Sequence, residues 1–432
     1  ISIGVPKCAS YLTMQNKMEA NDRFKKDLQY YRFCLYGFLK NLRFFEPFLL
    51  LFFLNNGLSF LQTGILYSTL EIVRNIAEIP AGFVSDTLGR RKTMVASFAV
   101  YIISFGIFYF SDEFTGFITA IVFFALADAF RTGTHKAMIF AYLKIKGWQD
   151  QKTAYYGHTR SWSQTGSAIA SLIAAVIIFT EGAYRDVFLF TIIPYVLDMI
   201  NIGTYPKALE GSLKKKASAK EDFKKIWKAF ITSFKNLLII RTLASTSSHS
   251  GYFKAVKDYL QPLVKTLALS VPFLGNYSNE QRAAIFVGII YFVVYLITSR
   301  ASRASGVFKD RFSTYSKPLN ATMVIGFLFG LGGGLFHNFG LMGVAVTLFM
   351  GIFIIENLRK PLGIAYISGK LEEDSMATAL SVESQTKSLF AAILAPALGF
   401  SADTFGLGYG LAITSGILLL LAPIIMVKKS RG

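Results

Sequence analysis

Residues 82–92 read GFVSDTLGRRK, a short polar stretch that separates two long apolar runs. It combines two glycines and one acid with three consecutive bases, Arg90, Arg91 and Lys92. Because Lys and Arg collect in the cytoplasmic loops of membrane proteins, the bases predict a loop on the inner side of a membrane. An anchor of this kind needs only the bases, so the glycines and the acid indicate a second role.

The whole chain has the composition of a polytopic membrane protein. Of its 432 residues, 53% are hydrophobic and 16% are charged, whereas about a quarter of the residues of a soluble protein are charged. Several apolar runs approach or reach the ~20 residues that cross a bilayer core, among them residues 283–297 and 409–427. The sequence therefore predicts an all-α integral membrane protein.

Polar breaks between the apolar runs predict about twelve membrane-spanning helices. Six spans precede and six follow one long polar linker, which gives two six-helix bundles. The expected parts are a cytoplasmic segment 1–34, a first bundle 35–205, a linker 206–239, and a second bundle with a short basic tail, 240–432. The spans are 35–54, 60–84, 93–111, 115–143, 160–180, 187–205, 240–268, 283–300, 319–336, 340–366, 376–402 and 409–427.

The loop charges predict the orientation of the chain. The formal charge is +19, and only Arg185 and Arg282 are bases in loops that would lie outside. This asymmetry places both termini in the cytoplasm, and we assign the chain to the inner (plasma) membrane of a prokaryote. It also accounts for the basic charge without nucleic-acid binding. The first ~30 residues are polar and predict no cleavable signal peptide.

The second part of the linker predicts a basic amphipathic helix. Its apolar side chains recur at helical spacing, and lysines occupy the remaining faces. We expect such a helix to lie in the inner interface, with its lysines near anionic lipid headgroups. A calmodulin-type or nucleic-acid target is the alternative. The apolar residues are Phe223, Ile226, Trp227, Phe230, Ile231, Phe234 and Leu238, and the lysines are Lys220, Lys224, Lys225, Lys228 and Lys235.

The stretch 82–92, between the second and third of about twelve spans, resembles the signature loop of the major facilitator superfamily (MFS). The six-plus-six layout, the basic linker and the inside termini are similar to that family over nearly the whole chain. The resemblance implies two bundles that rock about a central site, with this loop as a gate on the inner side. The gate residues would be Gly82, Asp86, Gly89, Arg90 and Arg91.

Elementary chemistry supports a role for these residues beyond anchoring. Gly82 would allow a close helix approach, and Gly89 a tight turn with positive φ. Asp86 could bond the start of a neighbouring helix or pair with the following arginines. Two short echoes, GVFKDR at 306–311 and GFSADTFG at 399–406, agree with the internal repeats expected of such a fold.

Charged residues inside the spans are the candidates for function. Inserting each of them near the middle of a membrane helix costs ~2.5–3.5 kcal/mol on insertion scales, so each needs a reason to be there. The resemblance would place spans 1, 4, 7 and 10 around a central cavity, and each of them holds more bases than acids. A positive cavity would attract an anionic or zwitterionic solute, with Lys254, Lys257 and Arg359 as the leading bases. The substrate-binding or coupling candidates are Arg43, Glu46, Asp128, Arg131, Lys254, Lys257, Asp258, Glu356 and Arg359.

Helical register predicts ion pairs among these charges. Glu46 and Arg74 would lie at similar depth in antiparallel spans, as would Glu78 and either Lys40 or Arg43. These pairs would be structural, with a proton site at Glu46 or Glu78 as the alternative. Asp128 and Arg131 lie one helical turn apart, either as a coupling pair or as a static salt bridge.

Other chemistry finds no support in the sequence. The two cysteines, Cys8 and Cys34, and the four scattered histidines give no metal-ligand spacing. No phosphate-binding loop for ATP and no catalytic motif is present, so we expect neither an enzyme nor a cofactor. The glycines of GFLFGLGGGLF, residues 326–336, predict a helix-packing face.

The sequence as a whole predicts a monomeric secondary active transporter of a small anionic or zwitterionic solute. Proton coupling would rest on Glu46, Asp128, Asp258 and Glu356. One alternative is export of amphipathic or cationic compounds. Span 5 counts against it, because it lacks the Gly-Pro pattern found in the drug antiporters of the family that the chain resembles. Another alternative is a non-transporting assembly factor or receptor on the same fold.

Overall fold

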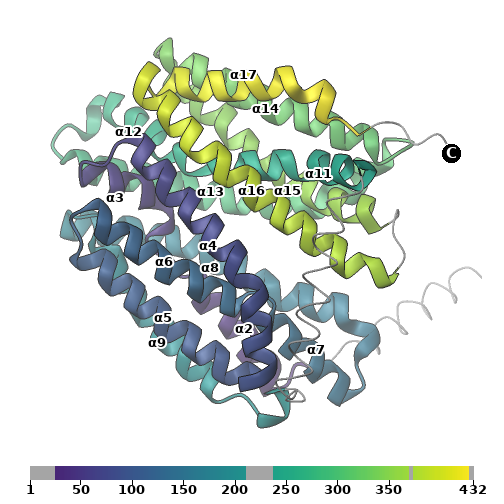
Figure 1. The fold of residues 1–432 in the computed structure, drawn as a ribbon. Coiled ribbons are helices and arrows are strands. Elements are labelled where there is room, and N and C mark those ends of the chain that lie inside the picture. The colour runs from purple at the N-terminus through teal and green to yellow at the C-terminus, as the bar shows by residue number, and fades with distance from the viewer. Residues whose placement is uncertain (1–24, 211–236, 369–372, 428–432) are drawn as a thin grey trace, which may run out of the picture.

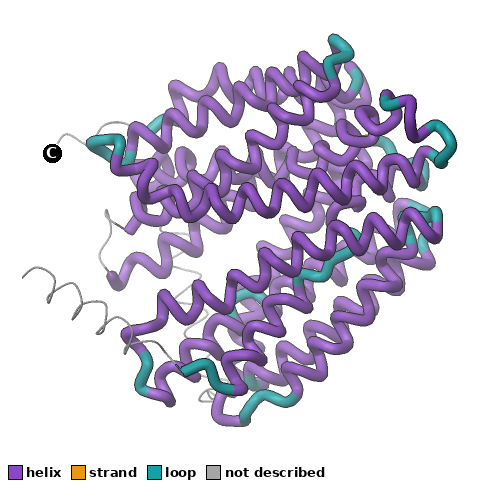
Figure 2. The backbone as a smooth tube through the Cα atoms, turned by 180° about the vertical axis from the view of Figure 1, so that it is seen from behind, coloured by secondary structure: helices purple, strands orange, loops and turns teal. Residues whose placement is uncertain are grey.

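The computed structural model describes residues 25–210, 237–368 and 373–427, and within these ranges it contains helices and no strand (Figure 2). The predicted linker helix lies largely outside the described residues. The first half contains α2 (Leu28–Lys40), η1 (Glu46–Phe48), α3 (Leu49–Asn55), α4 (Phe60–Leu88), α5 (Arg90–Phe110), α6 (Phe114–Arg131), α7 (Thr134–Lys146), η2 (Gln149–Gln151), α8 (Lys152–Glu181), α9 (Asp186–Gly203) and η3 (Lys207–Glu210). The second half contains α11 (Leu237–Val256), η4 (Lys257–Tyr259), α12 (Leu260–Ser270), η5 (Pro272–Leu274), α13 (Asn279–Asp310), α14 (Ser316–Asn338), α15 (Met342–Ser368), α16 (Glu373–Phe405) and α17 (Leu407–Ile425).

The helices form twelve crossings within the described ranges. Nine are long and apolar enough to span a membrane, with α6 and α7 counted as one crossing. The other three are α4, which carries several charges, and the interrupted pairs α2–α3 and α11–α12. Since twelve is even, Leu28, Gly89 and Val427 lie at one end of the molecule, which we term the termini end. We term the opposite end, with Gly57 and Gly406, the distal end.

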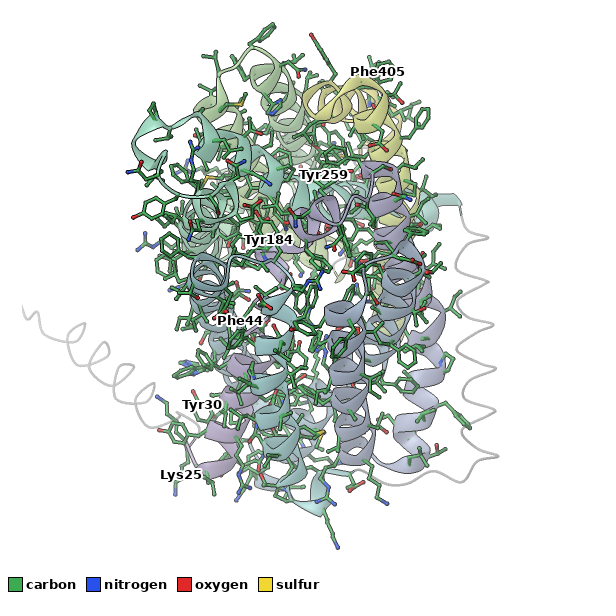
Figure 3. The ribbon with its side chains drawn as sticks, turned by 90° about the vertical axis from the view of Figure 1, so that its left-hand side faces the viewer. Lys25, Tyr30, Phe44, Tyr184, Tyr259 and Phe405 are labelled. Atoms are coloured by element: carbon green, nitrogen blue, oxygen red, sulfur yellow. The ribbon has the colours of Figure 1, made fainter. Side chains whose placement is uncertain are left out.

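The two halves lie side by side as separate bundles (Figure 1). Helix α4 packs along α16, and α8 packs along α13, so these two pairs connect the halves. In Figure 3, where the left-hand side of Figure 1 faces the viewer, Phe44 and Tyr184 of the first half lie below Tyr259 and Phe405 of the second. The predicted organisation into two six-helix bundles agrees with this arrangement.

Three crossings are interrupted, which the sequence analysis did not predict. The first is irregular over residues 41–45, the fourth breaks at Thr132 and Gly133, and the seventh contains the short helix η4. Gly133 has φ +81°, which a residue with a side chain rarely adopts. Irregular backbone at membrane depth is tolerated where it lines a cavity, so these breaks mark the position of a polar site.

The stretch 82–92 forms the end of α4, a one-residue turn at Gly89 and the start of α5. Gly89 has φ +96°, which confirms the predicted turn. A Cβ atom at Gly82 would meet no atom within 4 Å, so the predicted close approach at Gly82 is wrong for this arrangement of the bundles. Gly82 is exposed at this end of α4.

The echo at residues 399–406 is a structural counterpart of residues 82–89. Gly406 has φ +86° and is the single residue between α16 and α17, as Gly89 is between α4 and α5. The first turn lies at the termini end and the second at the distal end, as expected of an inverted repeat. The other echo, 306–311, is not a counterpart, because α13 runs through Asp310 and no glycine there has positive φ.

The glycines of α14 form the predicted packing face. A Cβ atom at Gly334 would lie 2.4 Å from the carbonyl oxygen of Gly408, and one at Gly326 would lie 2.0 Å from Nε2 of His249. These glycines let α17 and α11 approach α14 closely. The sequence prediction of a small-residue face is confirmed.

Candidate functional site

A polar cavity of about 290 Å³ lies between the two bundles. Side chains of α2, η1, α4 and α6 line it from the first half, and side chains of α11, η4 and α16 line it from the second. We term it the central cavity. Six bases and four acids face it: Lys40, Arg43, Arg74, Arg131, Lys254 and Lys257, with Glu46, Glu71, Asp128 and Asp258. The excess is two positive charges.

Asp128 is the centre of the charge cluster in the first half. Its Oδ1 lies 2.6 Å from Nη2 of Arg131, and its Oδ2 lies 2.7 Å from Nε of Arg74. Arg43 approaches Oδ1 more loosely, at 3.6 Å. The hydroxyl of Tyr101 donates a hydrogen bond of 2.6 Å to the same oxygen. One carboxylate thus faces three guanidinium groups, and the predicted contact between Asp128 and Arg131 is present.

Two ion pairs cross from one bundle to the other at the cavity. Lys254 lies 2.7 Å from Glu71, which also binds Arg74 at 3.0 Å. Lys257 lies 3.6 Å from Glu46 and 3.1 Å from Asp258 in its own half. These contacts tie charges of the first half to charges of the second, so a change of charge at either pair acts directly on the contact between the bundles.

Lys40 differs from the other bases of the cavity. Its side chain is partly buried and has no ion-pair or hydrogen-bond partner among the described residues. Burying an ammonium group without a partner is costly, because the group loses hydration without compensation. Lys40 is therefore the base of the cavity with the least compensated charge.

Two predicted site residues lie elsewhere. Arg359 is 2% exposed; it donates to the backbone oxygens of Ser245 and Leu319, inside the second bundle. Glu356 accepts hydrogen bonds from Ser250 at 2.7 Å and lies 2.9 Å from Nδ1 of His249, also inside that bundle. The expectation that span 10 lines the cavity is wrong: Glu356 and Arg359 bind residues of α11 and α14, and no residue of α15 lines the cavity, to which α4 and α16 contribute instead.

The predicted structural ion pairs are also wrong. Glu46 pairs with Lys257 rather than with Arg74, and Glu78 accepts a hydrogen bond from Gln385 of α16 rather than from Lys40 or Arg43. The reason is helix order. Helix α2 packs against α8 and α9, whereas α4 packs against α6 and α16, so equal depth does not bring these charges of spans 1 and 2 together.

The bases of the predicted gate bind within the first bundle. Arg91 donates to the backbone oxygen of Tyr205 and pairs with Glu210 at 3.2 Å, and Arg90 donates to the backbone oxygen of Ala137. They hold the start of α5 against η3 and α7. The gating role of Asp86 and its neighbours stays a prediction.

The distal end holds the bundles together through a contact that we term the distal latch. The carboxylate of Asp403, at the end of α16, accepts hydrogen bonds of 2.9 and 2.8 Å from the backbone N–H groups of Phe60 and Leu61. These are the first residues of α4, where N–H groups lack partners within the helix. Nearby, Gln261 of the second half accepts from the backbone of Leu50 at 2.8 Å.

Contacts between the bundles are sparser toward the termini end. Among the described residues, the hydrogen bonds of Gln385 with Glu78 and Asn75 are those nearest that end along α4. Within the described ranges, the bundles are therefore joined by hydrogen bonds at the distal end and along α4 as far as Glu78.

Sequence reasoning missed the tyrosines and one acid of the site. Tyr195 accepts from Arg43 at 2.8 Å, and Tyr101 binds both Asp128 and Arg131. Tyrosines of membrane proteins usually gather at the interfaces, so a tyrosine near the middle of a span was the available signal. Glu71 was likewise readable as a charge in span 2. The described residues contain no group of three potential metal ligands.

Comparison with known proteins gives the same architecture. A family model described as Major Facilitator Superfamily matches residues 33–382. An uncharacterized MFS-type transporter, YxaM of Bacillus subtilis (strain 168), is 24% identical over 388 residues, covering 88% of this chain and 90% of YxaM. Among solved structures, the nucleoside transporter NupG has a TM-score of 0.68 at 15% identity, covering 92% of this chain and 96% of NupG. A D-xylose-proton symporter has a TM-score of 0.67 at 14% identity, covering 93% of this chain and 96% of the symporter.

Proposed function

The chain belongs to the Major Facilitator Superfamily of membrane transporters, and we propose that it moves a small anionic or zwitterionic organic solute by alternating access. The central cavity would hold the solute, and the two bundles would rock about it. The termini end would face the cytoplasm of a prokaryotic cell, so the arrangement described here would be inward-facing. The chain would act as a monomer, without a cofactor or nucleic acid, and the linker would contact anionic headgroups.

The observation that carries this proposal is the charge balance of the central cavity. Six bases against four acids leave a positive excess in a partly dehydrated space, where charges interact more strongly than in water. Arg43 is the most loosely held of the three guanidinium groups at Asp128, and Lys40 has no partner among the described residues. A carboxylate or phosphate on the solute would supply the missing negative charge.

The carboxylates that link the bundles across the cavity are the groups whose protonation would couple proton movement to transport. Protonation of Glu71 or Glu46 would remove the ion pair with Lys254 or Lys257 and release that lysine for the solute. Asp128 is less suited because three guanidinium groups and Tyr101 hold its charge, and Glu356 is less suited because it lies outside the cavity. Replacing Glu46 and Glu71 by Gln should abolish the dependence of solute uptake on a pH gradient; unchanged dependence would refute this assignment.

The binding proposal is tested by thermal unfolding of the purified protein with metabolites grouped as anions, zwitterions and cations, at two pH values. We expect stabilisation by some anions or zwitterions, and a smaller shift in the Lys254→Gln variant. Lys144→Gln is the matched control, because Lys144 is an exposed base that does not line the central cavity. Stabilisation by cations alone would refute the positive-cavity proposal and favour the exporter alternative.

A further inference from the structure

A second cavity of about 450 Å³ lies within the first bundle, between α2, α7 and α8. We term it the vestibule. It shares Lys40 and Arg131 with the central cavity, so the two spaces adjoin. Its other bases are Lys136 and Arg160, and its lining includes no carboxylate. The central cavity, by contrast, balances much of its positive charge with four acids.

The bases of the vestibule are largely uncompensated. Lys40 and Arg160 have no ion-pair or hydrogen-bond partner among the residues that the structure describes. Lys136 lies over the rings of Phe140 and Tyr156, at 5.4 and 5.6 Å from their centroids, contacts that leave its charge intact. Arg131 pairs with Asp128 on the side of the central cavity. The vestibule is thus a concave space lined by four bases and no acid, and within the described part of the chain only Arg131 among these bases is paired, with Asp128 of the adjoining cavity.

The backbone adds partial positive charge to the same space. The break at Thr132 and Gly133 lines the vestibule, and α7 begins at Thr134 with no side chain capping its N-terminus. Uncapped N–H groups at a helix start favour a bound anion. This feature reinforces the bases, which are the main ground for the inference. The hydroxyl of Ser163 and the amide of Gln164, also in the lining, offer further hydrogen-bond donors.

We propose that the vestibule is a second anion-binding site, which holds the carboxylate or phosphate group of a small solute next to the central cavity. The site rests on the proposed function in that the transported solute is its natural occupant. Lys40 and Arg131 face both spaces, so an anion passes between them without leaving these two bases. Lys136 and Arg160 face the vestibule alone and distinguish it from the central cavity.

The test uses the full chain in nanodiscs of neutral phosphatidylcholine, with citrate and inorganic phosphate as probes at fixed ionic strength. The measured quantity is the apparent Kd from the shift of the unfolding midpoint. The vestibule variant is Lys136→Gln with Arg160→Gln; both side chains are exposed, so the variant should fold. The matched control is Lys144→Gln with Lys146→Gln, two exposed bases of α7 that line neither cavity.

At least one probe should stabilise the wild type and the control saturably. The vestibule variant should raise the apparent Kd about tenfold or more, the loss expected when a charge-assisted hydrogen bond is removed. No saturable stabilisation of the wild type by either probe, or an unchanged Kd in the vestibule variant, would overturn the proposal. Saturable stabilisation only by added phosphatidylglycerol would also overturn it, because the occupant would then be a lipid headgroup.

A third variant, Lys254→Gln, separates this proposal from the proposed function. Lys254 lines the central cavity and not the vestibule. If the vestibule variant weakens probe binding and Lys254→Gln does not, the vestibule site stands and anion binding in the central cavity fails. If Lys254→Gln weakens binding and the vestibule variant does not, anion binding in the central cavity stands and the vestibule site fails.

Discussion

Asp128 is the residue that balances the charge of the first bundle. Three guanidinium groups and one hydroxyl converge on a side chain that is only 6% exposed. Breaking a buried ion pair by removing one partner leaves the other charge buried and uncompensated. Loss of the Asp128 carboxylate would leave three guanidinium groups without their shared partner, so the cost in stability should be high.

Asp128→Asn should therefore lower the free energy of unfolding by about 3–5 kcal/mol. Thermal or denaturant unfolding of the purified protein measures this change. Asp112→Asn is the matched control, because Asp112 pairs with Arg185 on the surface, where such pairs contribute about 0–1 kcal/mol. Equal stability of the two variants would contradict the account of this cluster.

The two glycines of residues 82–89 give opposite predictions. Gly89→Ala should destabilise the protein by about 1–3 kcal/mol, because its φ of +96° falls where a Cβ atom is strained. Gly82→Ala should be neutral or stabilising by up to about 1 kcal/mol, because the glycine is inside α4 and a Cβ atom there meets open space. Unfolding midpoints of the two variants provide the comparison, and a larger loss for Gly82→Ala would contradict it.

At the residue scale, the sequence predicts contacts between near neighbours in the chain, but it does not predict which way a side chain points from its helix. The turn at Gly89 and the pair Asp128–Arg131 follow from neighbours in sequence, and both are present. Arg359 was expected in the cavity because of its charge and span. Which way it points depends on the rotation of α15 about its axis, which depends on how α15 packs against its neighbours α13 and α14.

At the scale of the elements, α4 and α16 form one of the two antiparallel pairs that connect the bundles. Each ends in G-F-x-x-D-T-x-G, at residues 82–89 and 399–406, and each ends at a glycine with positive φ. At the distal end, Asp403 of this sequence binds the first two N–H groups of α4. A carboxylate at a helix N-terminus is favourable because it satisfies N–H groups and the helix dipole.

Asp403→Asn should weaken the distal latch, since an amide accepts these bonds without a full negative charge. We expect spin labels at Glu113→Cys and Leu341→Cys, one in a distal loop of each half, to report an added population at longer distance. Asp112→Asn is again the control, because its pair with Arg185 lies within one half. A distance distribution that is the same in both variants would show that the contact does not hold the bundles closed.

The elements themselves were predictable, and their interruptions were not. Hydropathy and loop charge locate the apolar runs, so all twelve spans have a counterpart in the structure, although α8 begins eight residues before its predicted span and α13 ends ten residues after its own. The irregular residues 41–45 and the break at Gly133 depend on which side chains must reach the cavity. Which side chains those are depends on the tertiary arrangement of the helices, which the sequence pattern alone does not give.

At the scale of the whole molecule, two bundles enclose a positive cavity at their interface and a second one inside the first bundle. The six-plus-six layout was predictable because a bilayer leaves few ways to satisfy backbone hydrogen bonds. The sign of the cavity charge was also predicted: spans 1, 4 and 7 line the cavity as expected, and span 10 does not. Charges of α4 replace those of α15, and the positive excess remains.

The most direct test of the account is uptake, into proteoliposomes, of the anion or zwitterion that stabilises the protein most. We predict saturable uptake by the wild type and by Lys144→Gln, with most of the uptake lost in Lys254→Gln, because Lys254 lines the central cavity and Lys144 does not. Uptake confined to cationic compounds, or anion uptake that Lys254→Gln leaves unchanged, would contradict the claim that this cavity binds the transported solute.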